Sequence, residues 1–250
     1  MGIAGPEEYW MGDSLDSIYH PPEISSSESS FRYYDENAKS YVSMIATHAY
    51  SASQNDRRAL RNLARSHEKK LYQSEYDTGF SYSDKKNYLI LGDEISKDIN
   101  TLGAHGWVIW QAAPNNVPKE GGPDWGLVLT NEHEDYSITK KYYAMSNYSR
   151  FIDPGSRILE SSKPNVVLAH DSKDNELVIV VVNDENYDYS YEYDVGEFLE
   201  NGQAESYRTS MNENLEKGPA INISEGVFKA TAEEKSITTY LVSLDNDRED

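Results

Sequence analysis

The chain contains no cysteine, which excludes a disulfide framework and a metal site built on thiolates. It also lacks any run near the roughly 18 apolar residues of a membrane-spanning helix, and its N-terminus lacks the basic and then apolar segments of a secretion signal. Positive charge is scarce, because Lys and Arg number 23 against 43 Asp and Glu, for a formal net charge of −20. We therefore expect no membrane and no nucleic-acid partner, since both attract basic faces, whereas an uncharged polysaccharide is compatible.

The chain does have the length and the apolar content for a core, with 250 residues of which 38% are hydrophobic. In the first half, apolar runs alternate with helical patterns. The patterns predict strands at 42–47, 71–75 and 107–111, and helices at 55–70, 83–102 and 139–151. This order favours a parallel sheet with right-handed crossover connections. The serine-rich residues 25–30 and the Pro- and Gly-rich residues 112–125 predict loops.

The sequence period changes after Gly155, where short strand-like runs follow one another between Asn, Asp, Gly and Pro turns. The runs are 166–170, 176–183, 187–195, 205–211, 226–230 and 236–243, with hairpins predicted at 174–175 and 183–184. They indicate an antiparallel β-sandwich. Within residues 187–193 the tyrosines alternate strictly and so share one strand face, which favours packing between sheets over stacking on sugar rings. We predict domains at 1–152 and 153–245, followed by an acidic tail at 246–250.

Glu75 is the residue around which the first half is organised. It follows a short apolar run and precedes a turn glycine, so a buried strand is expected to open into a loop there. In a (β/α) barrel this strand end is the catalytic end. Taken alone, the triplet Ser-Glu-Tyr is more typical of a solvated carboxylate in a turn.

A series of stretches, taken together and in order, resembles a known family. They are THAY (47–50), RR (57–58), KLYQSEY (70–76), GWVIWQ (106–111), WGL (125–127), KYY (141–143), FIDPGSR (151–157) and SITTY (236–240). The series is similar to the C-terminal part of glycoside hydrolase family 30, a retaining clan A family, and most similar to its endo-β-1,6-galactanase branch. The resemblance implies an α/β plus all-β chain: strands five to eight of a TIM barrel, followed by an antiparallel β-sandwich.

The resemblance also implies roles for particular side chains. Glu75 would be the catalytic nucleophile. The implied substrate-binding residues are His48, Tyr50, Tyr76, Trp110, Gln111 and Trp125. A tryptophan beside a polar amide suits a sugar platform, and in related barrels the peptide bond after this tryptophan is often cis. For Arg57 and Arg58 a solvated helix face and a binding role are both open.

A retaining glycosidase needs two carboxyl groups, one as nucleophile and one as acid/base. The family places its acid/base within Asn-Glu-Pro, and no Asn-Glu-Pro occurs in this sequence. Asn131-Glu132 and Asn212-Glu213 lack the proline, and Glu7 and Glu8 resemble the end of strand five instead. We therefore expect a truncated product without its acid/base, whose open half-barrel edges invite self-association.

Three interpretations remain open: half of a hydrolase, a carbohydrate-binding protein that does not cut, and an inactive fragment. The expected ligand is a polysaccharide or oligosaccharide such as β-1,6-galactan, although the family also contains enzymes for xylan, β-1,6-glucan and glucosylceramides. Hydrolysis by two carboxyl groups needs no metal and no organic cofactor, so we expect none. The family is commonly secreted, which is the only indication of localisation.

Overall fold

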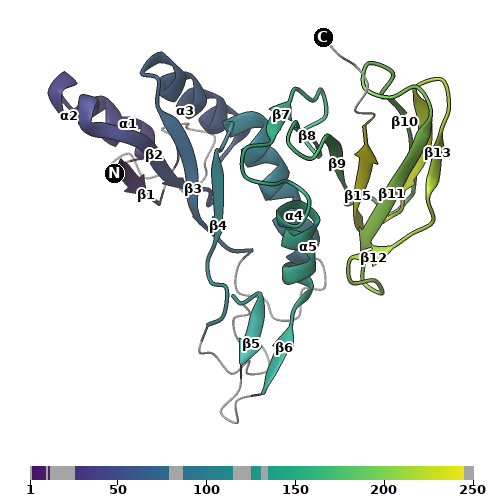
Figure 1. Cartoon of the computed structure of the whole chain (residues 1–250). Coiled ribbons are helices and arrows are strands. Elements are labelled where there is room, and N and C mark those ends of the chain that lie inside the picture. Colours follow the sequence, from purple (N-terminus) through teal and green to yellow (C-terminus); the bar gives the residue numbers. More distant parts are fainter. Residues whose placement is uncertain are drawn as a thin grey trace. The chain divides into compact units, whose positions relative to one another are not determined.

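The structure, a computed structural model, describes residues 2–9, 11, 26–78, 87–114, 125–130 and 135–244 (Figure 1). The chain divides into two compact units, which are described separately. The first unit comprises Met1–Gly79 and Lys97–Ala112, and the second comprises Phe80–Ser96 and Ala113–Asp250. The expected tail at 246–250 and most of the loop at 112–125 lie outside the described residues.

A four-stranded sheet forms the centre of the first unit. Its strands are β1 (Ile3–Glu8), β2 (Val42–His48), β3 (Lys70–Tyr76) and β4 (Gly106–Ile109). They pair in the order β1-β2-β3-β4, and every pairing is parallel. The expected parallel sheet is therefore confirmed. Strand β1 lies where the family resemblance implied a strand ending at Glu7 and Glu8, although the sequence pattern alone did not predict it, because the Gly-Pro pair within Ile3–Glu8 is more typical of a turn.

Helices connect these strands. They are α1 (Ser27–Tyr33), α2 (Glu36–Tyr41), α3 (Gln54–Ser66) and the short π-helix η1 (Asp98–Leu102). The loop predicted at 25–30 is wrong, since α1 begins inside it. Ser26 caps the helix by accepting a hydrogen bond from the Ser29 backbone N–H, and the Ser29 hydroxyl accepts one from the Ser26 N–H. Serine is a weak helix former but a strong N-cap, so a serine run can start a helix as readily as it can form a loop.

A buried ion pair connects three elements of the first unit. Arg57 of α3 is 1% exposed and Asp98 of η1 is 0% exposed, and Arg57 Nε donates to Asp98 Oδ1 at 2.8 Å. The indole Nε1–H of Trp107 in β4 donates to the other carboxylate oxygen, Oδ2, at 2.9 Å. Arg57 also donates to the backbone oxygen of Ala52. Arg57 therefore has a structural position, which replaces the expectation that it lies on the outside of the helix.

The second unit combines two helices, a small hairpin and an antiparallel β-structure. The helices are α4 (Asn87–Lys97), whose last residue belongs to the first unit, and α5 (Lys140–Ser149). The hairpin pairs β5 (Val128–Thr130) with β6 (Tyr136–Ile138). The remaining strands are β7 (Arg157–Leu159), β8 (Val166–Asp171), β9 (Glu176–Asn183), β10 (Tyr189–Asp194), β11 (Gly202–Thr209), β12 (Glu216–Lys217), β13 (Ile221–Ile223), β14 (Val227–Ala232) and β15 (Ser236–Ser243).

Two antiparallel sheets enclose the core of this unit. One runs in the order β12-β11-β15-β9-β8-β7, with β13 also paired to β11, and the other pairs β10 with β14. A shared cluster of buried side chains from both sheets includes Ile179, Phe228 and Tyr240. The hairpin predicted at 174–175 joins β8 to β9 and is confirmed, whereas the one at 183–184 is wrong, because β9 and β10 lie in different sheets. A turn signal marks a change of direction but does not fix the next pairing partner.

The alternating tyrosines of β10 face inward, as the packing interpretation requires. Tyr191 and Tyr193 pack against the core cluster, and the ring of Tyr193 stacks on Phe228 with centroids 4.8 Å apart. Burial raises the pKa of Tyr193 well above its ordinary value. Tyr187, at the outer end of the row, is exposed. The row therefore contributes mainly to the core.

The two long helices are tied to the β-structure of the second unit by buried hydrogen bonds. The Tyr148 hydroxyl of α5 bonds to Ser96 and to the Gly92 backbone oxygen of α4. Asn147 of α5 donates to Thr209 of β11 and accepts from Thr239 of β15. These bonds explain why α4 and α5 cluster with the strands. The domain boundary expected at 152/153 stays a prediction, since the compact units divide the chain differently.

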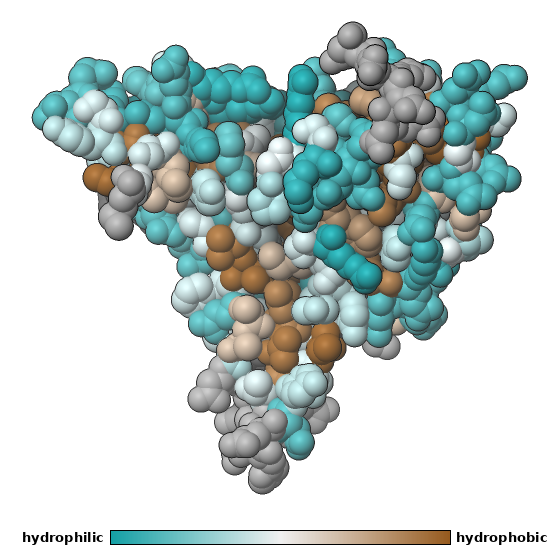
Figure 2. All heavy atoms as spheres, viewed as in Figure 1, coloured by the Kyte–Doolittle hydropathy of each residue, from teal (hydrophilic) through white to brown (hydrophobic). Residues whose placement is uncertain are grey.

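Hydrophilic side chains cover most of the face shown in Figure 2, and hydrophobic ones gather in limited areas of it. This distribution agrees with the large negative net charge. None of the helices in the described ranges has both the length and the apolar character needed to cross a membrane.

Replacing Asp98 by Ala should lower the free energy of unfolding of the first unit by about 3–5 kcal/mol, because Arg57 is left as an uncompensated buried charge and Trp107 loses its acceptor. Urea unfolding followed by the fluorescence of Trp107 would measure the loss. Glu36→Ala, which removes an exposed ion pair with Lys39, is the control and should leave the midpoint nearly unchanged. Equal midpoints for the two variants would contradict a structural role for the buried pair.

Candidate active site

The parallel strands bring their carboxyl ends to one edge of the sheet, and the predicted polar residues lie there. His48 is the last residue of β2, and Glu75 is the last but one of β3. The two are direct register partners, after a β-bulge between Thr47 and His48. The additional residue is Ser74 of β3, so the irregularity shifts the side-chain alternation of β3 by one residue and re-aims Glu75 relative to the strand before it.

Glu75 makes two contacts with side chains of β2 and the turn that follows it. The Tyr50 hydroxyl donates to Glu75 Oε1 at 3.2 Å, and His48 Nδ1 lies 3.6 Å from the same oxygen. On its other side, His48 Nε2 lies 3.6 Å from Glu7 Oε1, at the end of β1. The Glu75 side chain is 24% exposed, so the carboxylate is both held and accessible. Three neighbouring strand ends therefore contribute one polar group each.

Burial, followed by the charge of Glu75 and the hydrogen bond to it, raises the pKa of Tyr50 well above its ordinary value. The phenol therefore stays protonated over any physiological pH and remains a hydrogen-bond donor. A donor fixed on one carboxylate oxygen restricts the rotation of Glu75 and leaves the other oxygen, Oε2, for a different partner.

Aromatic rings stand beside this carboxylate in a row. Tyr9 stacks on Tyr50 with centroids 4.8 Å apart, and Tyr50 stacks on Tyr76 at 5.5 Å. Tyr76 in turn contacts Trp107 in a tilted arrangement at 6.1 Å. Tyr76 is buried, so the structure places it beneath Tyr50 rather than at the surface, whereas Tyr9 is 51% exposed. Rings with one open face are the surfaces on which proteins hold flat apolar faces of ligands.

Trp110 and Gln111 follow β4 at the same edge of the sheet. The backbone N–H of Trp110 donates to the Tyr76 oxygen at 2.9 Å, and the Trp110 side chain is 44% exposed. The peptide bond between Trp110 and Gln111 is cis, which confirms the expectation drawn from the family resemblance. Trp125 lies in the second unit, half-buried just before β5, so its predicted contact with substrate stays a prediction.

The sequence analysis missed Tyr9, and it placed Glu7 at a strand end without assigning it a role in the site. Glu7 lies near the end of β1 and Tyr9 follows that strand. The signal that could have found them was the one used elsewhere, polar and aromatic residues placed where a strand ends. Once β1 is recognised as a parallel neighbour of β2, its end must lie beside His48.

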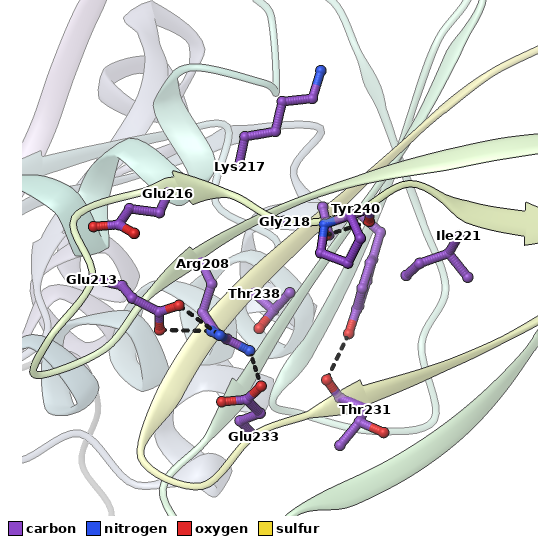
Figure 3. A pocket seen from close by; sticks show the side chains of 12 residues that line it. Arg208, Glu213, Glu216, Lys217, Gly218, Ile221, Thr231, Glu233, Thr238 and Tyr240 are labelled. Carbon is purple, nitrogen blue, oxygen red and sulfur yellow. Dashed lines mark hydrogen bonds and ion pairs between the residues drawn. The ribbon is translucent and has the colours of Figure 1, made fainter.

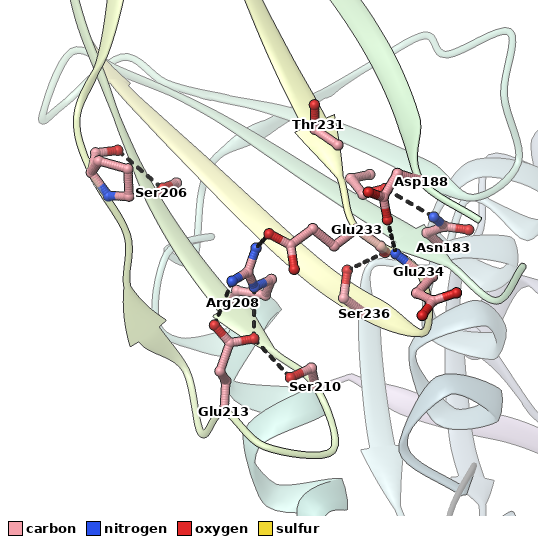
Figure 4. A network of polar contacts seen from close by, with 12 residues as sticks. Asn183, Asp188, Ser206, Arg208, Ser210, Glu213, Thr231, Glu233, Glu234 and Ser236 are labelled. Atoms are coloured by element: carbon pink, nitrogen blue, oxygen red, sulfur yellow. Dashed lines mark hydrogen bonds and ion pairs between the residues drawn. The ribbon is translucent and has the colours of Figure 1, made fainter. Parts of the chain in front are cut away.

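The second unit contains a separate cavity of about 270 Å³ between strands β11, β14 and β15 (Figure 3). Both cations of its lining are paired with carboxylates. Arg208 forms a bidentate pair with Glu213, at 2.5 and 2.7 Å, and a further ion pair with Glu233, while Ser210 donates to Glu213 (Figure 4). Lys217 pairs with Glu205 at 2.7 Å. These mutual contacts support a structural role in joining strand ends.

Within the part of the chain that the structure describes, Asp153, Asp171 and Asp174 are close enough together to hold a metal ion. Asp171 is already engaged, since its Oδ1 accepts the backbone N–H groups of Lys173 and Asp174, and its Oδ2 accepts from Ser156. These bonds lower the pKa of Asp171, the backbone ones most strongly. The cluster is explained as a turn, and we assign no metal to it.

Comparisons with known proteins identify relatives of both halves of the chain. No family model matches the sequence. Glucuronoxylanase XynC of Bacillus subtilis is 31% identical over 115 residues, which are 44% of this chain and 26% of the relative. Endo-beta-1,6-galactanase of Hypocrea rufa is 28% identical over 159 residues, 62% of this chain and 30% of the relative. The matches thus span about a quarter to a third of the curated relatives.

Solved structures show the same architecture. A GH30 endoxylanase from Clostridium papyrosolvens C71 superposes with a TM-score of 0.72 and 21% identity, covering 97% of this chain and 56% of that chain. The GH30 subfamily 8 xylanase Xyn30A from Clostridium acetobutylicum gives the same TM-score with 23% identity and 96% and 55% coverage. At these identities the similarity shows the fold. The fold is that of enzymes combining a TIM barrel with a β-sandwich, built from parallel and antiparallel sheets.

These relatives are glycoside hydrolases, and the two xylanase structures belong to glycoside hydrolase family 30. The chain is similar to them, as the sequence resemblance predicted, and the partial coverage fits the C-terminal part of such an enzyme. The relatives include both a galactanase and a glucuronoxylanase, so the galactanase branch stays a prediction.

Replacing Glu75 by Gln should lower the pKa of Tyr50 while leaving it above the ordinary tyrosine value. The negative charge and the charged acceptor that favour the neutral phenol would be lost, whereas its burial would remain. The change would be measured by NMR with ¹³C-labelled tyrosine. The quantity to compare is the pH at which the resonance of the Tyr50 ring carbon that bears the hydroxyl begins to move. Glu8→Gln is the control, and an unchanged onset in Glu75→Gln would show that the two groups do not interact.

Proposed function

We propose that the chain supplies the nucleophile and part of the sugar-binding surface of a retaining glycosidase acting on a β-linked polysaccharide. The observation that carries the proposal is the position of Glu75, which is partly exposed at the carboxyl edge of a parallel sheet, with the Tyr50 hydroxyl on one carboxylate oxygen. Active sites of (β/α) barrels form at this edge. The polysaccharide-cleaving activities named for the curated relatives support the same substrate class.

In the proposed first step, a Glu75 oxygen attacks the anomeric carbon while the bond from that carbon to the leaving oxygen breaks, and the leaving oxygen takes a proton from a second carboxylic acid. A glycosyl ester of Glu75 results. Water then attacks the same carbon, its proton passes to the second carboxylate, and Glu75 is released with net retention. Because Tyr50 donates to Oε1, we assign the attack to Oε2.

The remaining residues of the edge would bind the sugar. Trp110 offers a partly exposed ring as an apolar platform, and Gln111 offers an amide that can both donate to and accept from ring hydroxyls. We give His48 the role of orienting Glu75 and contacting a hydroxyl, since it lies between Glu7 and Glu75. Tyr9 extends the aromatic surface next to Tyr50.

The second carboxyl group is proposed to come from outside these 250 residues. A retaining site needs it about 5–5.5 Å from the nucleophile, and the family context for it, Asn-Glu-Pro, does not occur in the sequence. For the fold, we propose that β1 to β4 correspond to strands five to eight of a TIM barrel. In the described ranges no strand pairs with the outer edges of β1 and β4, which supports pairing with another polypeptide, including a second copy.

For the substrate we propose β-1,6-galactan first, following the branch that the sequence stretches resemble, with glucuronoxylan as the alternative. A non-catalytic carbohydrate-binding protein is the second candidate function, because the same aromatic and polar groups can hold a glycan without an acid/base. Binding that persists in Glu75→Gln, together with no turnover by the unmodified chain, would favour this second candidate.

An activated 2-fluoro-galactoside should label the folded protein at Glu75, because the fluorine slows hydrolysis of the ester and the good leaving group needs no acid. Intact-protein mass and peptide mapping would detect one added glycosyl group. Glu75→Gln should take no label, whereas Glu36→Gln, at an exposed helix position, should label like the unmodified chain. Repeating the test with a 2-fluoro-xyloside compares the two substrates. Absence of any label in a folded sample would refute Glu75 as nucleophile.

A 2,4-dinitrophenyl glycoside should react where the natural polymer does not. General acid catalysis contributes typically 10²–10⁴-fold, and this leaving group does not require it. We therefore expect dinitrophenolate release that added azide accelerates, with polymer cleavage about 10²-fold slower or more until a polypeptide carrying barrel strands one to four is supplied. Colorimetric and reducing-sugar assays measure the two rates. Efficient polymer cleavage by the chain alone would contradict the missing acid/base but not the role of Glu75.

A further inference from the structure

The first unit contains a second pocket, at the end of the sheet opposite Glu75. Its volume is about 350 Å³, and its lining comes from the end of α3, the start of β3 and the segment between η1 and β4. The lining residues are Arg61, Ala64, Arg65, Glu68, Lys69, Leu71, Leu102, Gly103 and His105. Leu71 of this lining and Glu75 are four residues apart on β3, so at about 3.3 Å each the pocket lies roughly 13 Å along the strand from Glu75.

The charge of this lining is opposite to that of the protein. Three basic side chains, Arg61, Arg65 and Lys69, surround the pocket with one acidic side chain, Glu68, although the whole chain carries −20. Arg61 and Arg65 are four residues apart on α3, a spacing at which like charges repel. Within the described ranges, neither Arg65 nor Lys69 forms an ion pair with a carboxylate. The cavity in the second unit shows the opposite arrangement, because both of its cations are paired.

Two further groups of the lining are held in place. Arg61 Nη1 donates to the backbone oxygen of Asn100 at 3.1 Å, which fixes the guanidinium beside the cavity. The Leu71 N–H donates to His105 Nδ1 at 3.4 Å, which holds the imidazole beside the cavity. Burial, and secondarily the charge of Lys70, lower the pKa of His105. Arg61 and His105 are therefore held at the pocket, whereas Arg65 lies on an exposed position of α3.

The floor of the pocket is apolar. Ala64, Leu71 and Leu102 close its inner end, and because they are 1%, 2% and 0% exposed they present little surface to a ligand. A volume of about 350 Å³ is within the range of roughly 300–1,000 Å³ in which proteins bind small organic ligands, and it exceeds what a bare oxyanion fills. The chemistry that fits is an anionic group on a compact organic body.

We propose that this pocket is a binding site for a small organic anion, with its carboxylate or phosphate group held by Arg61, Arg65 and Lys69 and its body filling the rest of the volume. Guanidinium groups bind planar and tetrahedral oxyanions through paired N–H donors, and an ammonium adds a point charge. The site is independent of the chemistry proposed for Glu75, since it lies at the other end of the sheet and uses no residue of that edge.

The test is an NMR titration of the ring protons of His105 at low ionic strength, where screening is weakest. The probes are inorganic phosphate, glucose 6-phosphate, galacturonate and, as the uncharged comparison, glucose. Saturable shifts with the anions and none with glucose are expected. Tighter binding of inorganic phosphate than of both organic anions would leave the remaining volume of the pocket without a role and would overturn the organic part of the proposal. Tighter binding of glucose 6-phosphate or of galacturonate would identify phosphate or carboxylate as the preferred group.

The paired variant Arg65→Gln/Lys69→Gln should weaken anion binding at least tenfold. It should fold as stably as the unmodified chain, because the repulsion between neighbouring cations is relieved. The matched control is Lys173→Gln/Lys229→Gln, which removes the same charge from exposed positions in the second unit and should change affinity less than twofold. Equal weakening by the control pair, equal shifts with glucose, or no saturable shift of His105 would each overturn the proposal.

Discussion

Parallel strand pairing is the constraint on which the first unit depends. Four strands pair in sequence order, and every one runs in the same direction, so their carboxyl ends meet at one edge and their amino ends at the other. Hydrogen-bonded register then decides which side chains become neighbours. His48 and Glu75 are 27 positions apart in the chain, yet they are partners across two strands. The edge that gathers Glu7, His48, Tyr50 and Glu75 is a consequence of this topology.

The buried pair Arg57–Asp98 supports that sheet from the side of the helices. It connects α3 to η1, and through Asp98 it also holds the indole of Trp107 in β4. An ion pair in a dry interior stabilises a fold only when its remaining hydrogen-bonding positions are satisfied, as the Ala52 oxygen and the Trp107 N–H do here. The pair therefore fixes how α3 and η1 lie against the strands. Through Trp107 it also fixes the position of the residues that follow β4.

Charge is distributed differently over the two units. In the second unit, Arg208 and Lys217 are neutralised by nearby carboxylates, which joins β11 to β12 and to the end of β14. In the first unit, the carboxyl edge of the sheet presents Glu7 and Glu75, and the amino edge presents Arg61, Arg65 and Lys69. One sheet thus has an acidic edge with exposed aromatic rings and a basic edge over an apolar floor. The two edges suit different ligands, which is why the proposals for them are independent.

Much of the local structure was determined by the sequence itself. Apolar periodicity located β2, α3, α5 and most strands of the second unit, and the strict alternation of tyrosines correctly placed them on one inward face, because side-chain period follows directly from backbone geometry. The sequence pattern also predicted correctly that Glu75 lies at the end of a strand. The sequence did not determine the serine-capped α1, the pairing of β10 with β14 rather than β9, or the burial of Arg57. Those features depend on contacts between residues far apart in the chain, so only the tertiary structure decided them, including the bond between Tyr50 and Glu75.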